Sequence, residues 1–348
     1  MGTTWNIDTL RILATVLLVA YHVIGINSDG GMEVADSSGW RFAADLLRDV
    51  RMPLFAFIAG AVYALRPLSL DGIVGFTLGK GRRLVVPGVI ASLVFWVLGN
   101  TVFSGAFSTG APLIEAIAMS YGHFWFLQAL LILFLTVSVL DAALRYRAAV
   151  PLLVAACILN LVWHDLGIDT PRALEVTRAV YLAPGFLIGM ILIRHGAALA
   201  EWRALLALVA AVMLAAGLWL NLEVYWETGS LSRNRMDMQS LLAGTGAIIL
   251  LYMATPRIAW CDRIAVMAFT IYLYHPFGTS LARRLFEALE IDAGLLRFTS
   301  GLIIGFGLPV VFHVLAHRFG PMRRLLLGLR ASGGSRRQPD GGGSLRPN

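Results

Sequence analysis

Long apolar runs recur along the whole chain, and they restrict the folds that are open to it. Hydrophobic residues make up 58% of the 348 residues and charged residues only 14%, whereas an ordinary soluble domain carries about 25% charged residues. The runs are continuous and do not alternate as the strands of a transmembrane barrel do. Because backbone polar groups inside a bilayer must be bonded within helices or a closed barrel, we expect an all-α, polytopic integral membrane protein.

About ten segments have the length and apolar character of transmembrane helices, several of them near the lower limit of about 17 residues. An even number of spans places both termini on the same side. On this topology the side that holds the termini carries the larger share of Lys and Arg, which predicts that both termini are cytoplasmic. The predicted spans are residues 6–26, 50–66, 84–103, 123–141, 148–163, 179–195, 203–222, 239–256, 263–283 and 296–318.

The chain is predicted to form one transmembrane domain, residues 1–320, followed by a short basic cytoplasmic tail, residues 321–348. The end of that tail is rich in Gly, Ser, Pro and Arg, a composition typical of disordered segments. The formal net charge is +7. In a membrane protein such an excess indicates topology and contact with anionic lipid, so no nucleic-acid partner is expected.

The first predicted span carries three ionisable residues on one face. Arg11 and His22 are about three helical turns apart, or about 16 Å along the axis, and Asp8 lies one turn before Arg11. Burying an ionisable group in hydrocarbon costs at least a few kcal/mol, so such groups usually face a polar interior. Snorkelling would explain Arg11 alone, and a hydrogen bond to a neighbouring helix would explain His22 alone. Their shared face favours a functional site.

The spacing of Asp8, Arg11 and His22 resembles the first helix of the membrane-bound acyltransferase-3 family. Some relatives have a second histidine beside the first, where this chain has Tyr21. The similarity extends to about residue 320, with further motifs in the expected order. These are residues 52–60 (MPLFAFIAG), 80–87 (KGRRLVVP), 123–127 (HFWFL) and 272–276 (YLYHP).

The resemblance implies an enzyme that transfers an acyl group from cytosolic acyl-CoA to an acceptor, usually a sugar hydroxyl at the outer side of the membrane. A short acyl group is expected, with acetyl favoured. The expected acceptor is an exported or lipid-linked glycan such as an exopolysaccharide, and the expected location is a bacterial inner membrane. Acyl-CoA is a co-substrate and no bound cofactor is expected. Membrane lipids are further partners, and a homodimer is compatible with the sequence.

Under this interpretation His22 is the general base that takes the proton from the acceptor hydroxyl, a role that suits an imidazole at neutral pH. A transient acyl-histidine is an alternative route. Asp8 and Arg11 would hold each other and orient the donor. The charged end of the donor would stay near Arg11, while its thioester reaches toward His22.

Nine further residues are candidates for substrate binding. Lys80, Arg82 and Arg83 form a cationic cluster in an inner loop, where the phosphates of CoA would arrive. The preference of cytoplasmic loops for positive charge explains the same cluster without a ligand. The other six candidates are Arg51, His123, Trp125, Phe126, Tyr274 and His275.

Each of these six also has a structural explanation. Trp125 and Phe126 suit interfacial anchoring as well as stacking on an acceptor. His275 precedes Pro276, which breaks a helical hydrogen bond, so its imidazole can face a cavity or simply satisfy the freed carbonyl. Arg51 can meet an anionic acceptor at the outer mouth or remain a solvated end residue.

Two other functions are alternatives for such a chain. A transporter or flippase for a lipid-linked sugar would favour two halves with matching interrupted helices, and the sequence shows none. A purely structural scaffold leaves the placement of Asp8, Arg11 and His22 unexplained. His313 and His317 are spaced as a zinc-binding pair would be, but no acidic or sulfur partner accompanies them, so no metal site is predicted.

Overall fold

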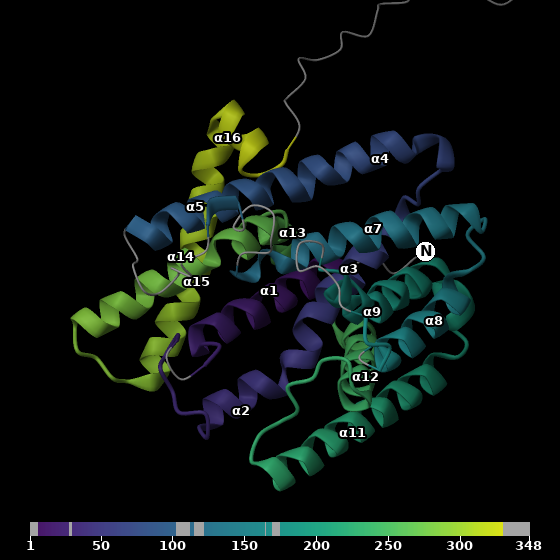
Figure 1. Ribbon diagram of the computed structural model, residues 1–348, viewed down its shortest axis with the longest axis horizontal. Helices are drawn as coiled ribbons and strands as arrows, with labels where there is room; N and C mark the ends of the chain where they lie inside the picture. The colour runs from purple at the N-terminus through teal and green to yellow at the C-terminus, as the bar shows by residue number, and fades with distance from the viewer. Residues whose placement is uncertain are drawn as a thin grey trace, which may run out of the picture.

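A computed structural model of the protein describes residues 6–27, 30–101, 112–114, 122–163, 165–168 and 175–329. Within these ranges all the regular structure is helical (Figure 1). The α-helices are α1 (Ile7–Ile24), α2 (Gly39–Leu46), α3 (Arg48–Leu65), α4 (Ile73–Lys80), α5 (Val86–Thr101), α7 (Trp125–Ala143), α8 (Ala149–Val162), α9 (Val176–Arg194), α10 (Gly196–Leu199), α11 (Arg203–Thr228), α12 (Met238–Ala254), α13 (Ala259–Ala265), α14 (Ala268–Ala288), α15 (Gly294–Arg318) and α16 (Gly320–Leu325). Short turns of other helical types are η2 (Leu70–Gly72), η3 (Gly81–Val85) and η4 (Gly122–Phe124).

A helix lies in each of the ten predicted segments, of which residues 102–103 lie outside the described residues, and the chain is an all-α, multi-pass membrane protein. Six helical segments of the described chain are long and apolar enough to cross a membrane: α1, Leu70–Thr101, Gly122–Ala143, α9, α11 and α15. The pair α13 and α14, bent by 73°, passes the same test as one span. α8 and α12 are shorter apolar helices, and α3 carries charged residues in its first turn. The number of spans and the side of the termini stay predictions.

The predicted tail begins in the described part of the chain, where α16 forms a short helix at its start. Residues 330–348, which include the Gly- and Ser-rich end of the tail, lie outside the described residues.

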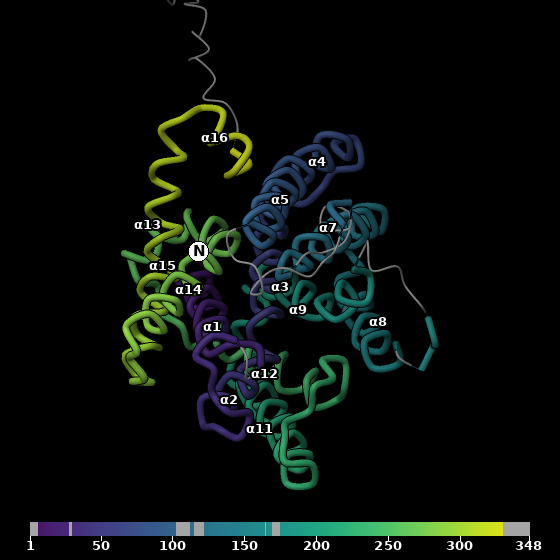
Figure 2. Tube along the Cα trace, turned by 60° about the vertical axis from the view of Figure 1, so that its left-hand side comes forward, coloured from purple at the N-terminus to yellow at the C-terminus, as the bar shows by residue number. Residues whose placement is uncertain are grey.

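α1 lies in the middle of the bundle, with α13, α14 and α15 on one side and α3 on the other (Figure 2). Its first half buries Leu10 and Ala14 completely, and Val19 in its second half is also fully buried. Because α1 is surrounded in this way, the side chain at its C-terminal end is positioned by several elements that are distant in sequence. His22 is the basic residue of that last turn.

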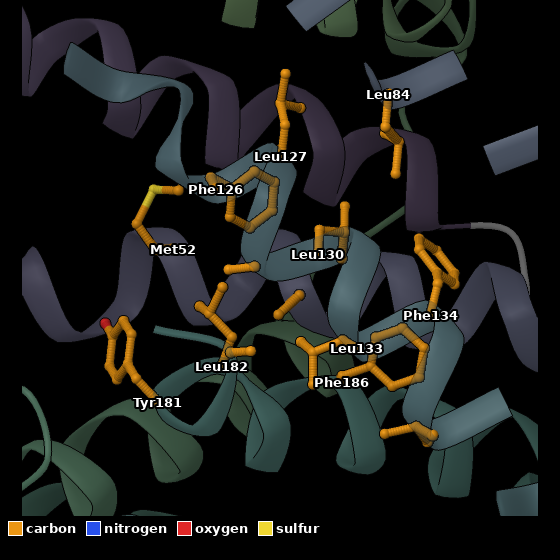
Figure 3. Close-up of a cluster of buried hydrophobic side chains, with 14 of the residues drawn as sticks. Met52, Leu84, Phe126, Leu127, Leu130, Leu133, Phe134, Tyr181, Leu182 and Phe186 are labelled. Carbon is orange, nitrogen blue, oxygen red and sulfur yellow. The ribbon is translucent and has the colours of Figure 1, made fainter. Parts of the chain in front are cut away.

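An extended apolar cluster fills the space between α3, α7 and α9 (Figure 3). Phe126, Leu130 and Phe134 all project from α7 into it, and Leu182 and Phe186 come from α9. The rings of Phe134 and Phe186 meet edge to face with centroids 5.3 Å apart, an arrangement that aromatic pairs prefer. This packing fixes the start of α7, where several of the predicted site residues lie.

Glycines allow α3 and α9 to approach closely. A side-chain carbon at Gly60 would collide with the backbone carbonyl of Phe186, and one at Gly189 would collide with that of Phe57. Only a residue without a Cβ fits such a contact, as in other tightly packed membrane helices. The close approach of α9 therefore holds α3, and the charged residues of its first turn, in a defined position.

An ion pair between a fully buried carboxylate and a partly buried guanidinium joins the ends of three helices. The guanidinium of Arg194 in α9 donates two hydrogen bonds to the carboxylate of Asp141 in α7, at 2.7 and 2.8 Å. The hydroxyl of Tyr63 in α3 donates a third, at 2.8 Å. Asp141 is completely buried. Since removing one partner of a buried pair leaves an uncompensated charge, this contact is expected to stabilise the bundle strongly.

We predict that Asp141→Asn lowers the free energy of unfolding by about 3–5 kcal/mol, because the Arg194 guanidinium loses its charged partner. At roughly 2–4 °C per kcal/mol for a domain of 150–250 residues, the melting temperature in detergent should fall by several degrees. The control is Asp262→Asn, whose pair with Arg257 is more exposed and should matter by less than about 1 kcal/mol. Equal effects of the two variants would contradict a special role for the buried pair.

Candidate active site

Three histidines from distant parts of the chain lie together. His22 is in the last turn of α1, His123 is in the turn η4 that precedes α7, and His275 is in the middle of α14. The ring centroid of His22 is 4.8 Å from that of His275 and 6.1 Å from that of His123. The rings of His123 and His275 are 5.2 Å apart. The structure thus brings together all three histidines that the sequence motifs single out.

Hydrogen bonds to the backbone fix the orientation of His275. Its Nδ1 lies 2.9 Å from the carbonyl oxygen of Tyr272 and 3.0 Å from that of Ile271. Carbonyl oxygens only accept, so Nδ1 carries the proton and Nε2 carries the lone pair. The Tyr272 carbonyl is free to accept because Pro276 has no N–H to offer it. Among the described residues Nε2 has no hydrogen-bond partner, and it is buried.

His123 is held by two contacts with α14. Its Nε2 donates to the carbonyl oxygen of Leu273 at 3.3 Å, and the hydroxyl of Tyr272 donates to the carbonyl oxygen of His123 at 2.6 Å. These bonds connect the turn η4 to the helix that carries His275. The relative positions of the two histidines are therefore fixed by backbone groups of both elements.

Two of the three histidines, His22 and His123, line a cavity of about 400 Å³. Its wall combines apolar side chains with a small number of polar groups, which is usual for ligand sites. The polar and aromatic members of the wall are Tyr21, His22, Arg51, Phe95, His123, Trp125, Arg235 and Tyr272. His275 lies behind this wall, since its side chain is completely buried, and the neighbouring Pro276 lines the cavity. We call this space the histidine cavity.

Two arginines contribute to the histidine cavity. Arg51, in the first turn of α3, is only 3% exposed, and its guanidinium carbon lies 3.4 Å from the centroid of the Tyr21 ring. Arg235 is half-buried in the connection between α11 and α12, and its guanidinium carbon is 5.9 Å from the ring of Trp125. The guanidinium carbon of Arg178 lies 4.8 Å from the centroid of the same Trp125 ring. The cavity therefore has a positive wall with aromatic side chains on it.

A second cavity, of about 450 Å³, contains the predicted cationic cluster. Lys80, Arg82 and Arg83 line it together with Arg66, and no acidic side chain of the described residues lines it. Arg82 and Arg83 lie on η3, a π-helical turn, and such wide turns are frequent at functional sites. The ammonium group of Lys80 lies 3.1 Å from the centroid of the Phe134 ring. We call this space the basic cavity.

The two cavities lie at opposite ends of α3. Arg51 lines the histidine cavity and Tyr63 lines the basic cavity. These residues are twelve positions apart on one helix, which corresponds to about 18 Å. α1 and α3 both contribute to the histidine cavity, α1 by its C-terminal end and α3 by its N-terminal end. The N-terminal end of α1 is therefore on the same side as the basic cavity.

Asp8 and Arg11 lie at that N-terminal end. Nη1 of Arg11 is 2.5 Å from Oδ1 of Asp8, and both side chains are partly exposed. Neither residue lines the histidine cavity. The structure thus joins these two residues to each other and separates them from His22.

Phe126 and Tyr274 also lie outside the histidine cavity. Phe126 is buried and packs against the rings of Phe55 and Tyr272, with centroids 5.8 and 5.7 Å away. Tyr274 is buried against Phe312, with centroids 4.6 Å apart. Both residues pack in the core that supports the site, and neither forms part of its surface.

Several lining residues were not among the candidates from sequence. Tyr21 and Tyr272 lie within the matched segments. The candidates predicted there are the nearby histidines, His22 and His275. Arg235 lies in a polar connection, and Arg66 follows the end of α3. In the sequence both look like ordinary loop arginines, so only the folded chain assigns them to cavities.

His313 and His317 are stacked at 6.0 Å between ring centroids, and Nδ1 of His313 is 2.7 Å from the hydroxyl oxygen of Thr270. Within the part of the chain that the structure describes, no group of three or more His, Cys, Asp or Glu side chains is arranged to hold a metal ion. His22, His123 and His275 are therefore not arranged to hold a metal ion.

Comparison with known proteins gives one match. A family model described as an acyltransferase domain, that of the acyltransferase-3 family, matches residues 4–314. No curated protein and no solved structure matches the chain. The matched range contains both cavities and all five motifs that resemble this family. The chain therefore belongs to the acyltransferase-3 family and is a membrane acyltransferase.

Proposed function

We propose that the protein transfers a short acyl group, acetyl, from cytosolic acyl-CoA to a hydroxyl of an exported or lipid-linked glycan in the inner membrane of a bacterium. One observation carries this proposal. A cavity lined by four cations and a cavity lined by two histidines, with a third histidine buried behind them, lie at opposite ends of α3. A charged donor and a hydroxyl acceptor can thus approach one reaction centre from opposite sides of the membrane.

The basic cavity suits the nucleotide end of acyl-CoA. Phosphate groups bind best to guanidinium and ammonium groups, and arginine adds a fork of parallel donors. Arg66, Arg82 and Arg83 supply such forks, and Nε of Arg82 is buried without a partner among the described residues. The ion pair of Asp8 and Arg11 is on the same side of the membrane as the basic cavity. It stabilises the N-terminal end of α1.

The histidine cavity suits the transfer step. A ring nitrogen of His22 takes the proton from the acceptor hydroxyl as the oxygen attacks the carbonyl carbon of the thioester. The carbon–sulfur bond breaks, the thiolate leaves, and the proton on His22 passes to it. The products are the glycan ester and free CoA. A general base of this kind contributes about 10²–10⁴-fold to the rate.

His275 would position the base. Its Nδ1–H is engaged by the backbone, so its Nε2 offers a lone pair 4.8 Å, ring to ring, from His22. A bond from an N–H of His22 to this lone pair leaves the other nitrogen of His22 free to accept the proton of the hydroxyl. His123, held by α14, forms the wall on the other side and can bond the acceptor.

Buried apolar side chains of α7 lie between the two cavities. Phe134 contacts Lys80 at the basic cavity, and Phe126 contacts Tyr272 at the histidine cavity. Leu127 and Leu130 lie between them on α7 and are buried. The thioester arm of the donor would pass along this face of α7, among these apolar side chains.

A transporter for a lipid-linked sugar was the main alternative from sequence. The family assignment favours a transferase instead. No feature of the described residues favours transport over transfer.

Replacing His22 with Ala is predicted to lower kcat/KM for acyl transfer by about 10²–10⁴-fold, because the acceptor hydroxyl loses its base. The assay incubates the purified protein with radiolabelled acetyl-CoA and isolated surface glycan, and measures alkali-labile label on sugar. The control is His317→Ala, an exposed histidine on α15, which should retain normal rates. Normal transfer by the His22 variant, with unchanged melting temperature, would remove His22 from the mechanism.

Arg83→Gln is predicted to raise KM for acyl-CoA about tenfold with little change in kcat, because a charge-assisted hydrogen bond to phosphate contributes about 1.5 kcal/mol to donor binding. The same variant should use an acyl-pantetheine, which lacks the nucleotide phosphates, as well as the wild type does. Arg147→Gln, an exposed cation outside the cavity, is the control. An equal loss with both donors would show that Arg83 does not bind the phosphates.

A further inference from the structure

The histidine cavity holds two arginines that have no acidic partner among the described residues. Arg51 and Arg235 both line it, and no carboxylate of the described residues lies within ion-pair distance of either guanidinium. Arg51 is 97% buried, being 3% exposed. Buried arginines are normally paired, so this arrangement requires an explanation.

The carboxylates in this region are already engaged. Asp49 is buried and forms an ion pair with the adjacent Arg48, with Oδ1 3.6 Å from Nε, which is too long for a hydrogen bond. Asp237 caps α12, where it accepts from the backbone N–H of Ser240 at 2.9 Å and from the hydroxyl of Ser232 at 2.5 Å. Arg51 and Arg235 are therefore left with their charge directed into the cavity.

The ring of Tyr21 offsets only part of the cost of burying Arg51. A cation–π contact contributes about 2 kcal/mol when it is desolvated, whereas removing a charge from water costs several kcal/mol. An anion bound between the two guanidinium groups would offset the rest of this desolvation cost. That anion would have to be part of a ligand. Arginine's fork of donors matches the two oxygens of a carboxylate or of a phosphate.

We propose that the acceptor is acidic and carries an oxyanion, a carboxylate or a phosphate, that Arg51 and Arg235 bind inside the histidine cavity. This inference rests on the proposed function of the same cavity. Tyr21 holds Arg51 and is adjacent to His22 in α1. Binding the acidic group beside Tyr21 therefore brings a neighbouring hydroxyl of the same sugar to the histidine. The arginines select the substrate, and His22 carries out the chemistry.

Binding can be tested without turnover. The purified full-length protein is heated in detergent with glucuronic acid, glucose 1-phosphate or glucose, which separates a carboxylate source, a phosphate source and a neutral sugar. At least one acid should raise the melting temperature where glucose does not, and added salt should weaken the effect. Failure of both acids to exceed glucose would overturn the proposal.

Variants assign the effect to the arginines. Arg235→Gln should weaken acid binding at least tenfold, whereas Arg233→Gln, an exposed arginine of the same connection, should bind as the wild type does. Arg51→Lys keeps the charge but loses the fork, and avoids the folding risk of a neutral residue at a buried position. An equal loss in the Arg233 variant would show non-specific charge attraction and contradict the proposal.

Turnover separates substrate selection from catalysis. The wild type should have at least tenfold higher kcat/KM for a uronate- or phosphate-containing oligosaccharide than for its neutral counterpart. In Arg235→Gln this ratio should fall toward one through KM. An equal loss of kcat on both acceptors would instead make the arginines oxyanion stabilisers and overturn the proposal.

Transfer that favours neutral acceptors would also overturn it, while leaving the proposed function intact. Acid binding without any transfer would remove the proposed function and retain the anion site.

Discussion

The hydrogen bond from Nδ1 of His275 to the carbonyl of Tyr272 connects the backbone of α14 to the chemistry of the cavity. A proline in a membrane helix frees a carbonyl that no water can satisfy. Here the residue before Pro276 supplies the missing donor from its own side chain. That bond also decides which nitrogen of His275 keeps a lone pair, and it holds the ring where it meets His22. A requirement of the backbone thus sets the orientation of a group at the proposed reaction centre.

The helices α1 and α3 are antiparallel, and their two ends place the two cavities on opposite sides of the molecule. The His22 end of α1 and the Arg51 end of α3 form one cavity, while the other end of α3 borders the basic cavity. Close packing through Gly60 and Gly189 fixes α3 against α9. The Asp141–Arg194 pair, which accepts a hydrogen bond from Tyr63, fixes the C-terminal end of α3. The separation of about 18 Å between the cavities therefore follows from the rise of a rigid helix. Such a separation would suit the proposed reaction, in which the donor and the acceptor come from different compartments.

The sequence predicts the helices well because the apolar runs are local and their length is set by the bilayer. It also identifies His22, His123 and His275, each within its own motif. Their convergence is not predictable, since the three residues come from segments more than a hundred positions apart and meet through packing between α1, η4 and α14. Arg235 could not be found for a similar reason: in a polar connection an arginine looks solvated, and only the fold places it over Trp125. Conversely, Phe126 and Tyr274 have the residue types of a binding site but pack in the core, because aromatic side chains serve both purposes equally well.

The distribution of positive charge supports a functional reading of the arginines at the histidine cavity. On the predicted topology the basic cavity is cytoplasmic, so orientation alone already favours Lys and Arg there. Arg51 and Arg235 are on the opposite side, where the same rule disfavours them, and Arg51 is also buried. Neither topology nor an ion pair within the described residues accounts for these two side chains. These two charges oppose the topological preference and carry a desolvation cost, so a negatively charged ligand explains them better than the fold does. The two arginines are therefore more informative about the substrate than the larger cationic cluster is.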